Sequence, residues 1–254
     1  MINPMQLNNK TIMITGASSG IGRETAKIVS SLGASVILVA RSEDKLQSLI
    51  KELEGENHKY YCFDLKEITD IEMLIKKIVQ ENGSLDGFVH SAGVGSTRPL
   101  HMLKPDKLNE VMNVNFNSFI EIVRCLSKKN NLNDGASIVG VSSVAGQQGN
   151  QSKTAYCASK AAMDAAVRCI AKELSSRTIR ANTVAPGLAK TELFQQFINN
   201  SGSESEDAKN VMKRQYLGIV QPNNVGNTIA FLLSDASMFV TGSTIAIDSG
   251  RLTS

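Results

Sequence analysis

Short β-branched segments alternate with longer segments of helical periodicity along most of this 254-residue chain. Several of the strand-like segments are apolar almost throughout, as parallel strands covered on both faces require. The alternation predicts an α/β fold in which helices cover both faces of a parallel sheet. The expected strands are 11–15, 35–40, 60–63, 86–90, 137–141, 179–184 and 243–247. The expected helices are 21–32, 42–53, 68–81, 106–129, 154–176 and 223–234.

The composition argues against several classes of function. The net charge is +3, from 27 basic and 24 acidic residues, so neither nucleic acid nor a membrane surface is an expected partner. The length and the 42% hydrophobic content suit one domain over residues 1–254. The four cysteines form no C-x-x-C pair, and we expect buried free thiols in a cytoplasmic protein without signal peptide or membrane span. The three histidines follow no ligand pattern, so no metal site is indicated.

One long excursion interrupts the alternation. It runs from Gly187 to Gln221 and contains a polar stretch, 199–207, rich in serine and glutamate. An excursion of this length in a compact fold usually has a functional role or is mobile. We expect a substrate lid over residues 188–220, and a surface loop with short helices is the alternative.

A glycine-rich turn joins the first expected strand to the first expected helix. Residues 15–22 read T-G-A-S-S-G-I-G, a G-x-x-x-G-x-G spacing. Glycines let the backbone turn tightly and approach a pyrophosphate, and the following helix offers free N–H groups to the phosphates. The turn therefore predicts a dinucleotide site in a single-domain, Rossmann-type doubly wound fold of about seven strands. Its expected cofactor contacts are Gly16, Ser18, Ser19, Gly20, Ile21 and Gly22.

The turn after the second strand favours NADP(H). An acidic residue usually accepts a hydrogen bond from a free ribose 2′-hydroxyl at this position, but residues 39–42 contain none. Arg41 would instead face a 2′-phosphate with a planar, permanently charged guanidinium. We expect NADP(H) as the preferred cofactor, and NAD(H) stays open if Arg41 is only a solvated surface residue.

Tyr156 and Lys160 are spaced for acid/base chemistry. They lie four residues apart in an alanine-rich helical segment, which places both on one helix face. A free tyrosine has a pKa near ~10, and a neighbouring ammonium lowers that value. The pair can therefore move a proton to or from an alcohol oxygen. Ser143, at the end of the preceding strand, could hold a substrate carbonyl or could simply cap the strand end.

With these motifs in register, the chain resembles the classical short-chain dehydrogenases/reductases over nearly its whole length. Residues 15–22 resemble the family's T-G-x-x-x-G-I-G, residues 90–93 its N-N-A-G, and Pro186-Gly187 with Thr191 its P-G…T segment at the nicotinamide end. Two departures are Ser91, where the family has asparagine, and Ser249, where D-G-G is usual. The second requires a backbone conformation that a Cβ tolerates.

The resemblance implies a catalytic set of Asn115, Ser143, Tyr156 and Lys160. Tyr156 would be the acid in reduction and the base in oxidation, and Lys160 would lower its pKa and hold the nicotinamide ribose. Ser143 would orient the carbonyl, and Asn115 would hold a water that links Lys160 to solvent. Besides Tyr156 and Lys160, the implied cofactor contacts beyond the turn are Asp64, Leu65, Ser91, Ala92, Gly93, Pro186, Gly187, Ala189 and Thr191.

Within the family, the phrases at 134–139 and 179–187 resemble 3-oxoacyl-(acyl-carrier-protein) reductases most. Arg124 and Arg168 could serve an acidic carrier protein, or they could be solvated residues on helix faces. A dehydrogenase for a sugar, a steroid or another alcohol is the alternative within the same fold. A non-catalytic dinucleotide-binding redox sensor is the alternative of another class. The resemblance also implies a homo-oligomer, a tetramer or a dimer.

Overall fold

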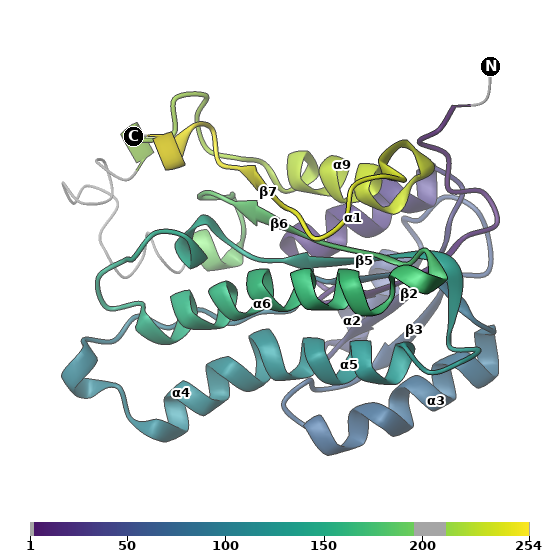
Figure 1. The fold of residues 1–254 in the computed structure, drawn as a ribbon, viewed down its shortest axis with the longest axis horizontal. Coiled ribbons are helices and arrows are strands. Elements are labelled where there is room, and N and C mark those ends of the chain that lie inside the picture. The colour runs from purple at the N-terminus through teal and green to yellow at the C-terminus, as the bar shows by residue number, and fades with distance from the viewer. Residues whose placement is uncertain (1–2, 196–211, 254) are drawn as a thin grey trace.

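The computed structural model describes residues 3–195 and 212–253, and it confirms the expected α/β architecture. Seven parallel strands form one sheet in the order β3-β2-β1-β4-β5-β6-β7 (Figure 1). The strands are β1 Thr11–Thr15, β2 Ser35–Ala40, β3 Lys59–Cys62, β4 Leu85–His90, β5 Leu132–Val141, β6 Arg180–Pro186 and β7 Thr244–Ile247. The order reverses between β1 and β4, and ligands of open α/β sheets bind at the carboxyl ends of strands at such a switch point.

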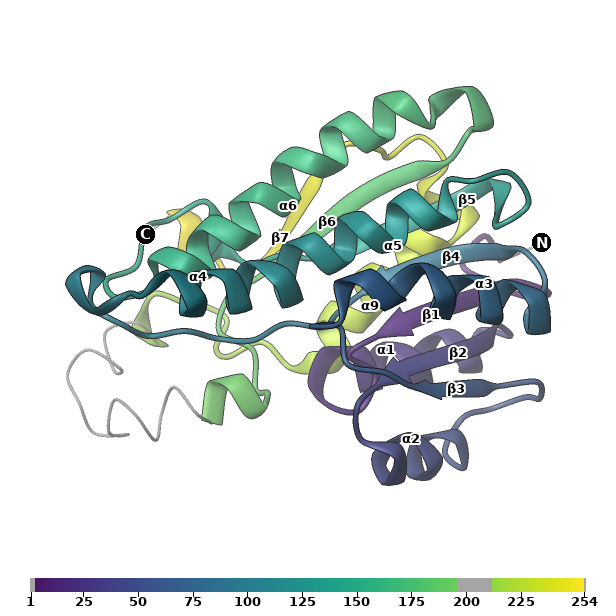
Figure 2. The same ribbon diagram turned by 90° about the horizontal axis from the view of Figure 1, so that it is seen from below.

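Helices cover both faces of the sheet (Figure 2). The main helices are α1 Gly20–Ser31, α2 Glu43–Ile50, α3 Ile71–Asn82, α4 Pro105–Met112, α5 Ser118–Leu126, α6 Thr154–Glu173 and α9 Pro222–Leu233. One hydrophobic core lies under α3, α5 and α6, and a second lies under α1, α2 and α9. Neighbouring β1 residues divide between them, since Met13 faces the first core and Ile12 and Ile14 face the second. This alternation is the two-residue period of a strand buried on both faces.

The expected helix 106–129 is a single helical run with an irregular turn in its middle. Residues Asn113–Asn117 form a π-helical turn between α4 and α5. In this turn the carbonyl of Val114 accepts a 2.9 Å hydrogen bond from the side-chain hydroxyl of Ser118. Such single-turn π-bulges occur frequently at functional sites. The turn contains Asn115, one of the four expected catalytic residues.

Other differences from the expected elements are small. Strand β5 begins at Leu132 rather than at residue 137, and α2 ends at Ile50.

The four cysteines are free, as expected, but only Cys125 is buried. Cys62 lies on the edge strand β3 and Cys169 on the outer face of α6, so both are exposed. In the part of the chain that the structure describes, no helix is both long and apolar enough to cross a bilayer.

The expected lid over residues 188–220 is described only at its two ends, 188–195 and 212–220. Its polar stretch, 199–207, lies entirely outside the described residues. Its two described ends meet beside β6. The buried amide of Gln215 accepts a hydrogen bond from the N–H of Leu188 and donates to the carbonyls of Leu188 and Gly218, at 3.2 and 3.1 Å. Ala189 also forms an isolated parallel bridge with Val220. Both ends of the excursion are therefore anchored at the carboxyl edge of the sheet.

Candidate active site

The glycine turn after β1 lies directly against the end of β4. Gly16 has φ +67°, and a Cβ there would lie 2.6 Å from the backbone nitrogen of Ala92. Glycine is thus required both for the left-handed backbone and for the close approach. Thr15 and His90 are partners in the sheet register, which places residues 91–93 beside the turn. The structure therefore brings together two of the expected cofactor segments at the switch point.

Thr191 closes the same turn from the side of β6. A Cβ on Gly20, which has φ +54°, would lie 3.2 Å from the Cγ2 atom of Thr191. Ser19 precedes α1 without making a side-chain cap, and the first turn of α1 contains no acidic residue. The N–H groups at this helix end therefore suit an anionic ligand. A groove of about 630 Å³ opens here, and its lining includes Ser18, Ser19, Gly20 and Thr191.

The remaining expected cofactor residues occupy the rim of the site. Arg41 directly follows β2, and its Nη1 atom lies 3.9 Å from an oxygen of Asp64, with both side chains well exposed. Leu65 is buried in the core beside them, and Ile21 packs partly against the opposite core. Pro186 ends β6, and a Cβ on Gly187 would lie 3.0 Å from the Cα atom of Asp248. Ser249 has φ +54°, so the departure from D-G-G does place a side chain in the left-handed region.

Asn115 is fully buried and its side-chain amide is committed to protein partners. Its Oδ1 atom accepts a 2.8 Å hydrogen bond from the N–H of Val94, and its Nδ2 donates to the Val94 carbonyl and to the Ser159 hydroxyl, at 3.1 and 3.0 Å. These bonds tie the π-turn to the loop after β4 and to α6. A Cβ on Gly93 would lie 3.5 Å from both Asn115 Oδ1 and Lys160 Nζ. The side chain thus holds the walls of the site together.

Lys160 is 4% exposed and reaches the end of β5. Its Nζ atom donates a 2.7 Å hydrogen bond to the carbonyl of Val141, and its own backbone carbonyl accepts one from the hydroxyl of Ser142. Burial lowers the pKa of Lys160 to about 8, and the negative charge of Asp164 acts in the opposite direction. The ammonium is therefore close to titrating in the neutral range.

Tyr156 lies one helical turn before Lys160, and its ring centroid is 5.8 Å from Lys160 Nζ. Burial raises the pKa of Tyr156, and a side-chain hydrogen bond with Ser143 works against that rise. The net direction is upward because burial of the phenol has the largest effect, and the lowering expected from the Lys160 ammonium stays a prediction. The phenol consequently stays protonated at neutral pH.

Ser143 caps the short turn after β5 and also has its hydroxyl beside Tyr156. Its hydroxyl accepts a 3.2 Å hydrogen bond from the N–H of Ala145 and so caps the short helical turn Val144–Gly146. The same side chain contacts the phenol of Tyr156. The strand-end cap and the polar contact in the site therefore coexist in one residue.

Three residues beside the site have no role predicted from the sequence, although His90 belongs to the 90–93 motif. His90 is buried, with Nδ1 3.0 Å from the Thr15 hydroxyl, and burial together with the Lys160 charge lowers its pKa to about 3. Ser159 binds Asn115, and Asp164 lies one further turn along α6 from Lys160. The four-residue spacing of 156, 160 and 164 is the one signal that could have identified Asp164.

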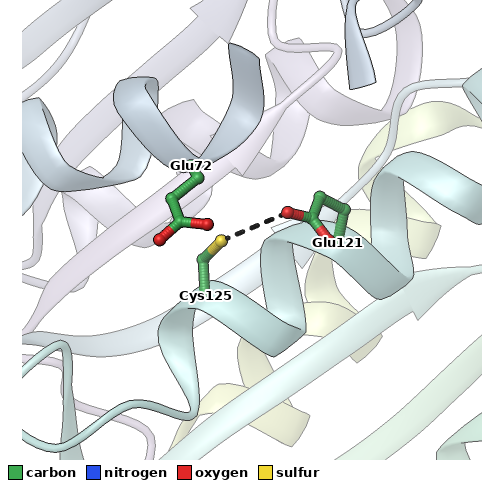
Figure 3. Close-up of side chains that lie close together, drawn as sticks. All are labelled: Glu72, Glu121 and Cys125. Carbon is green, nitrogen blue, oxygen red and sulfur yellow. Dashed lines mark hydrogen bonds between the residues drawn. The ribbon is translucent and has the colours of Figure 1, made fainter. Parts of the chain in front are cut away.

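A second cluster of polar side chains lies away from this site, between α3 and α5. Ligand-type atoms of Glu72, Glu121 and Cys125 lie within 4.8 Å of one another (Figure 3). Arg124 binds both carboxylates, at 2.8 and 2.6 Å, and Lys128 binds Glu72. Burial raises the pKa of Cys125 to about 11, which disfavours the thiolate that a metal requires. The cluster is an ion-pair network that joins the two helices.

The comparisons with known proteins agree with this geometry. A family model described as Enoyl-(Acyl carrier protein) reductase matches residues 16–251. The match spans the glycine turn, the π-turn, the Tyr156 helix and the segment after β6. The chain belongs to the short-chain dehydrogenase/reductase family and is an oxidoreductase that acts on carbonyl or alcohol groups.

Individual relatives cover nearly the whole chain. The 3-oxoacyl-(acyl-carrier-protein) reductase of Thermotoga maritima is 37% identical over 253 residues, which are 97% of this chain and 99% of that protein. The L-xylulose reductase of Caenorhabditis elegans is 31% identical, and the alignment covers 95% of each chain. The crystal structure of a dehydrogenase/reductase from Sinorhizobium meliloti superposes with a TM-score of 0.88 at 29% identity, covering 98% of this chain and 97% of that one.

Proposed function

We propose that this protein reduces the ketone of a 3-oxoacyl thioester to a secondary alcohol, with NADPH as the cofactor. The observation that supports the proposal is that the Tyr156 side chain has both Ser143 and Lys160 as neighbours, with Lys160 Nζ 5.8 Å from its ring centroid. The 37% identity with a 3-oxoacyl-(acyl-carrier-protein) reductase over 97% of the chain supports the substrate class.

The cofactor side of the site suits a dinucleotide. The tight glycines at positions 16 and 20 provide backbone N–H groups and space that a Cβ would fill. Arg41 is exposed directly after β2 and would bind a 2′-phosphate, while Asp64 and Thr191 would line the adenine and nicotinamide ends. When bound, the dihydronicotinamide supplies the hydride. The whole of residues 1–254 would act as one cofactor-binding and catalytic domain, with residues 188–220 as its lid.

The protein's own residues supply the proton and the orientation. Tyr156 would donate its phenolic proton to the carbonyl oxygen as the hydride reaches the carbonyl carbon, so that the ketone becomes an alcohol. Because burial raises the pKa of Tyr156, the phenol is protonated at neutral pH, as an acid in the reductive direction requires. Ser143 would hold the carbonyl oxygen, and Lys160 would hold the nicotinamide ribose. Asn115 would keep the π-turn in place beside Lys160, where a water could link the ammonium to solvent.

The test is a spectrophotometric assay of NADPH oxidation with acetoacetyl-CoA and a panel of other carbonyls. We expect turnover of the 3-oxoacyl thioester by the wild type and at least ~10²-fold less by Tyr156→Phe. If a pentulose is reduced and the thioester is not, the likeness to L-xylulose reductase identifies the substrate class better. If cofactor binds and no carbonyl is reduced, the redox-sensor hypothesis replaces this one.

Partners and location follow from the same proposal. An acyl carrier protein is acidic, and Arg168 is exposed on α6, whereas Arg124 is engaged by Glu72 and Glu121. We therefore expect Arg168 to contribute more than Arg124 to any carrier contact. We also propose a cytoplasmic homo-oligomer, a tetramer or a dimer, which light scattering of the purified protein would detect. A monomer at all concentrations would contradict this last point.

A further inference from the structure

Asp164 is a buried acid on the helix that carries Tyr156 and Lys160. The three residues follow one another at intervals of four along α6, so they share one face of the helix. Asp164 is 7% exposed and Lys160 is 4% exposed. A buried carboxylate costs free energy unless it is paired, and the proton transfer proposed above uses no acid at this position. The presence of Asp164 therefore requires a physical reason.

One oxygen of Asp164 is held by the neighbouring strand. Its Oδ1 atom accepts a 2.7 Å hydrogen bond from the hydroxyl of Thr183 on β6, which in turn lies 2.8 Å from the hydroxyl of Thr244 on β7. The other oxygen, Oδ2, is buried and has no hydrogen-bond partner within residues 3–195 and 212–253. The hydrogen bond from Thr183 therefore holds the Oδ1 atom, whereas the buried Oδ2 atom has no hydrogen-bond donor among the described residues.

The turn that carries Ser143 closes over the free oxygen. A Cβ on Gly146 would lie 3.3 Å from Asp164 Oδ2 and 2.9 Å from the backbone nitrogen of Ala161. The turn Val144–Gly146 thus packs directly against α6, next to the Asp164 carboxylate. Solvent is excluded from this contact, so the charge of Asp164 acts through a medium of low dielectric constant.

Few charges face Lys160. On its own helix they are Tyr156 and Asp164, and the titratable residue that faces it from β4 is His90, whose pKa is lowered to about 3 and which is therefore neutral at pH 7. From β5 it meets a neutral group, the carbonyl of Val141, and the neutral amide of Asn115 in the π-turn lies near the same point beside Gly93. Among the described residues, Asp164 is the anion that offsets the burial of the ammonium.

We propose that Asp164 is a positioning residue that keeps Lys160 protonated beside Tyr156, and that Thr183 holds Asp164 for this role. The proposal rests on the reductase function proposed above. It assigns the charge balance of the site to a residue that touches neither substrate nor cofactor. In effect, α6 carries an acid, a cation and an anion in succession along one face.

The main test is the pH dependence of kcat for Asp164→Asn, which removes the charge and keeps the shape. Without the anion, Lys160 loses its proton at lower pH, so the alkaline limb of the reductive rate should move down by about one pH unit. Such a shift gives about a fivefold loss of kcat at pH 8 and little loss at pH 6. KM for the carbonyl substrate should change little. A loss of equal size at every pH would indicate a merely structural role and would overturn the proposal.

Two further variants separate charge from packing. Thr183→Val removes the hydrogen bond to Oδ1 and keeps the carboxylate, so the limb should move in the same direction by a smaller amount. Glu173→Gln removes the same charge from the exposed end of α6 and should leave the profile unchanged. If Thr183→Val and Glu173→Gln behave alike, Thr183 does not hold Asp164 for this purpose.

A second measurement does not depend on turnover. Lysine labelled with ¹³C at Cε reports the titration of Lys160 by NMR, with the signal assigned by Lys160→Arg. We expect the Lys160 midpoint to fall in Asp164→Asn, or in Thr183→Val if the first variant does not fold. An unchanged midpoint would overturn the inference even in an active enzyme. A lowered midpoint in a protein that reduces no carbonyl would instead refute the proposed function and leave the charge relationship intact.

Discussion

The Nζ atom of Lys160 donates a 2.7 Å hydrogen bond to the carbonyl oxygen of Val141. Val141 ends β5, two residues before Ser143, so this bond fixes the Tyr156 helix against the strand that delivers the serine. A reciprocal bond from the hydroxyl of Ser142 to the carbonyl of Lys160 joins the same two elements. Two buried hydrogen bonds therefore join the Tyr156 helix to the residues directly before Ser143.

Arg41 is expected to select the cofactor. A charge-assisted hydrogen bond contributes about 1.5–3 kcal/mol, so Arg41→Ala should raise KM for NADPH by about 10- to 100-fold. KM for NADH should change little, because that cofactor lacks the 2′-phosphate. Steady-state kinetics with both cofactors measures the ratio, and Lys51→Ala, which removes another exposed cation, is the control. Equal effects on the two cofactors would show that Arg41 does not read the phosphate.

Gly16→Ala should damage both folding and cofactor binding. The left-handed backbone at φ +67° costs about 1–3 kcal/mol for a residue with a side chain, and the added Cβ would also meet the backbone of Ala92. We expect a lower Tm and a weaker Kd for NADPH, measured by thermal unfolding and fluorescence. Gly149→Ala is a matched control, since a Cβ there meets no atom within 4 Å. Tolerance of alanine at position 16 would contradict the close approach of the two segments.

His90 should make the protein sensitive to acid. Its pKa is lowered from 6.5 to about 3 in the folded protein, so between these values the unfolded chain binds one more proton than the folded one. The free energy of unfolding therefore falls as pH falls through this window, by up to about 1.4 kcal/mol per pH unit from this group. Denaturant titrations from pH 7 to 4 should show a shallower dependence for His90→Asn. Asparagine in place of the exposed His101 should leave the slope unchanged; if both variants behave alike, the acid sensitivity lies elsewhere.

The local sequence was sufficient for the parts of the site that lie on one element. The glycine turn, the pairing of Tyr156 with Lys160 and the basic residue after β2 all follow from spacing and from the position of a strand or helix end. The seven strands and their parallel direction followed from the alternation of elements, with boundary errors of a few residues at β5 and α2, whereas the strand order came from the structure.

The contacts between elements could not be read in the same way. The π-turn at Asn115 depends on Val94 and Ser159, which are 21 and 44 residues away along the chain. The direction of the Lys160 side chain depends on Val141, and the pKa of Tyr156 rises because the fold buries the phenol. The role proposed for Asp164 could not be predicted either, because it depends on the hydrogen bond from Thr183 on β6. These features are products of tertiary packing.

The most direct test of the central claim compares wild type with Tyr156→Phe in NADPH oxidation with acetoacetyl-CoA, with the Kd for NADPH measured on both proteins. We expect nearly equal Kd values and at least ~10²-fold lower kcat in the variant, because the phenylalanine keeps the packing and lacks the proton. Equal turnover by the two proteins would contradict the assignment of Tyr156 as the acid.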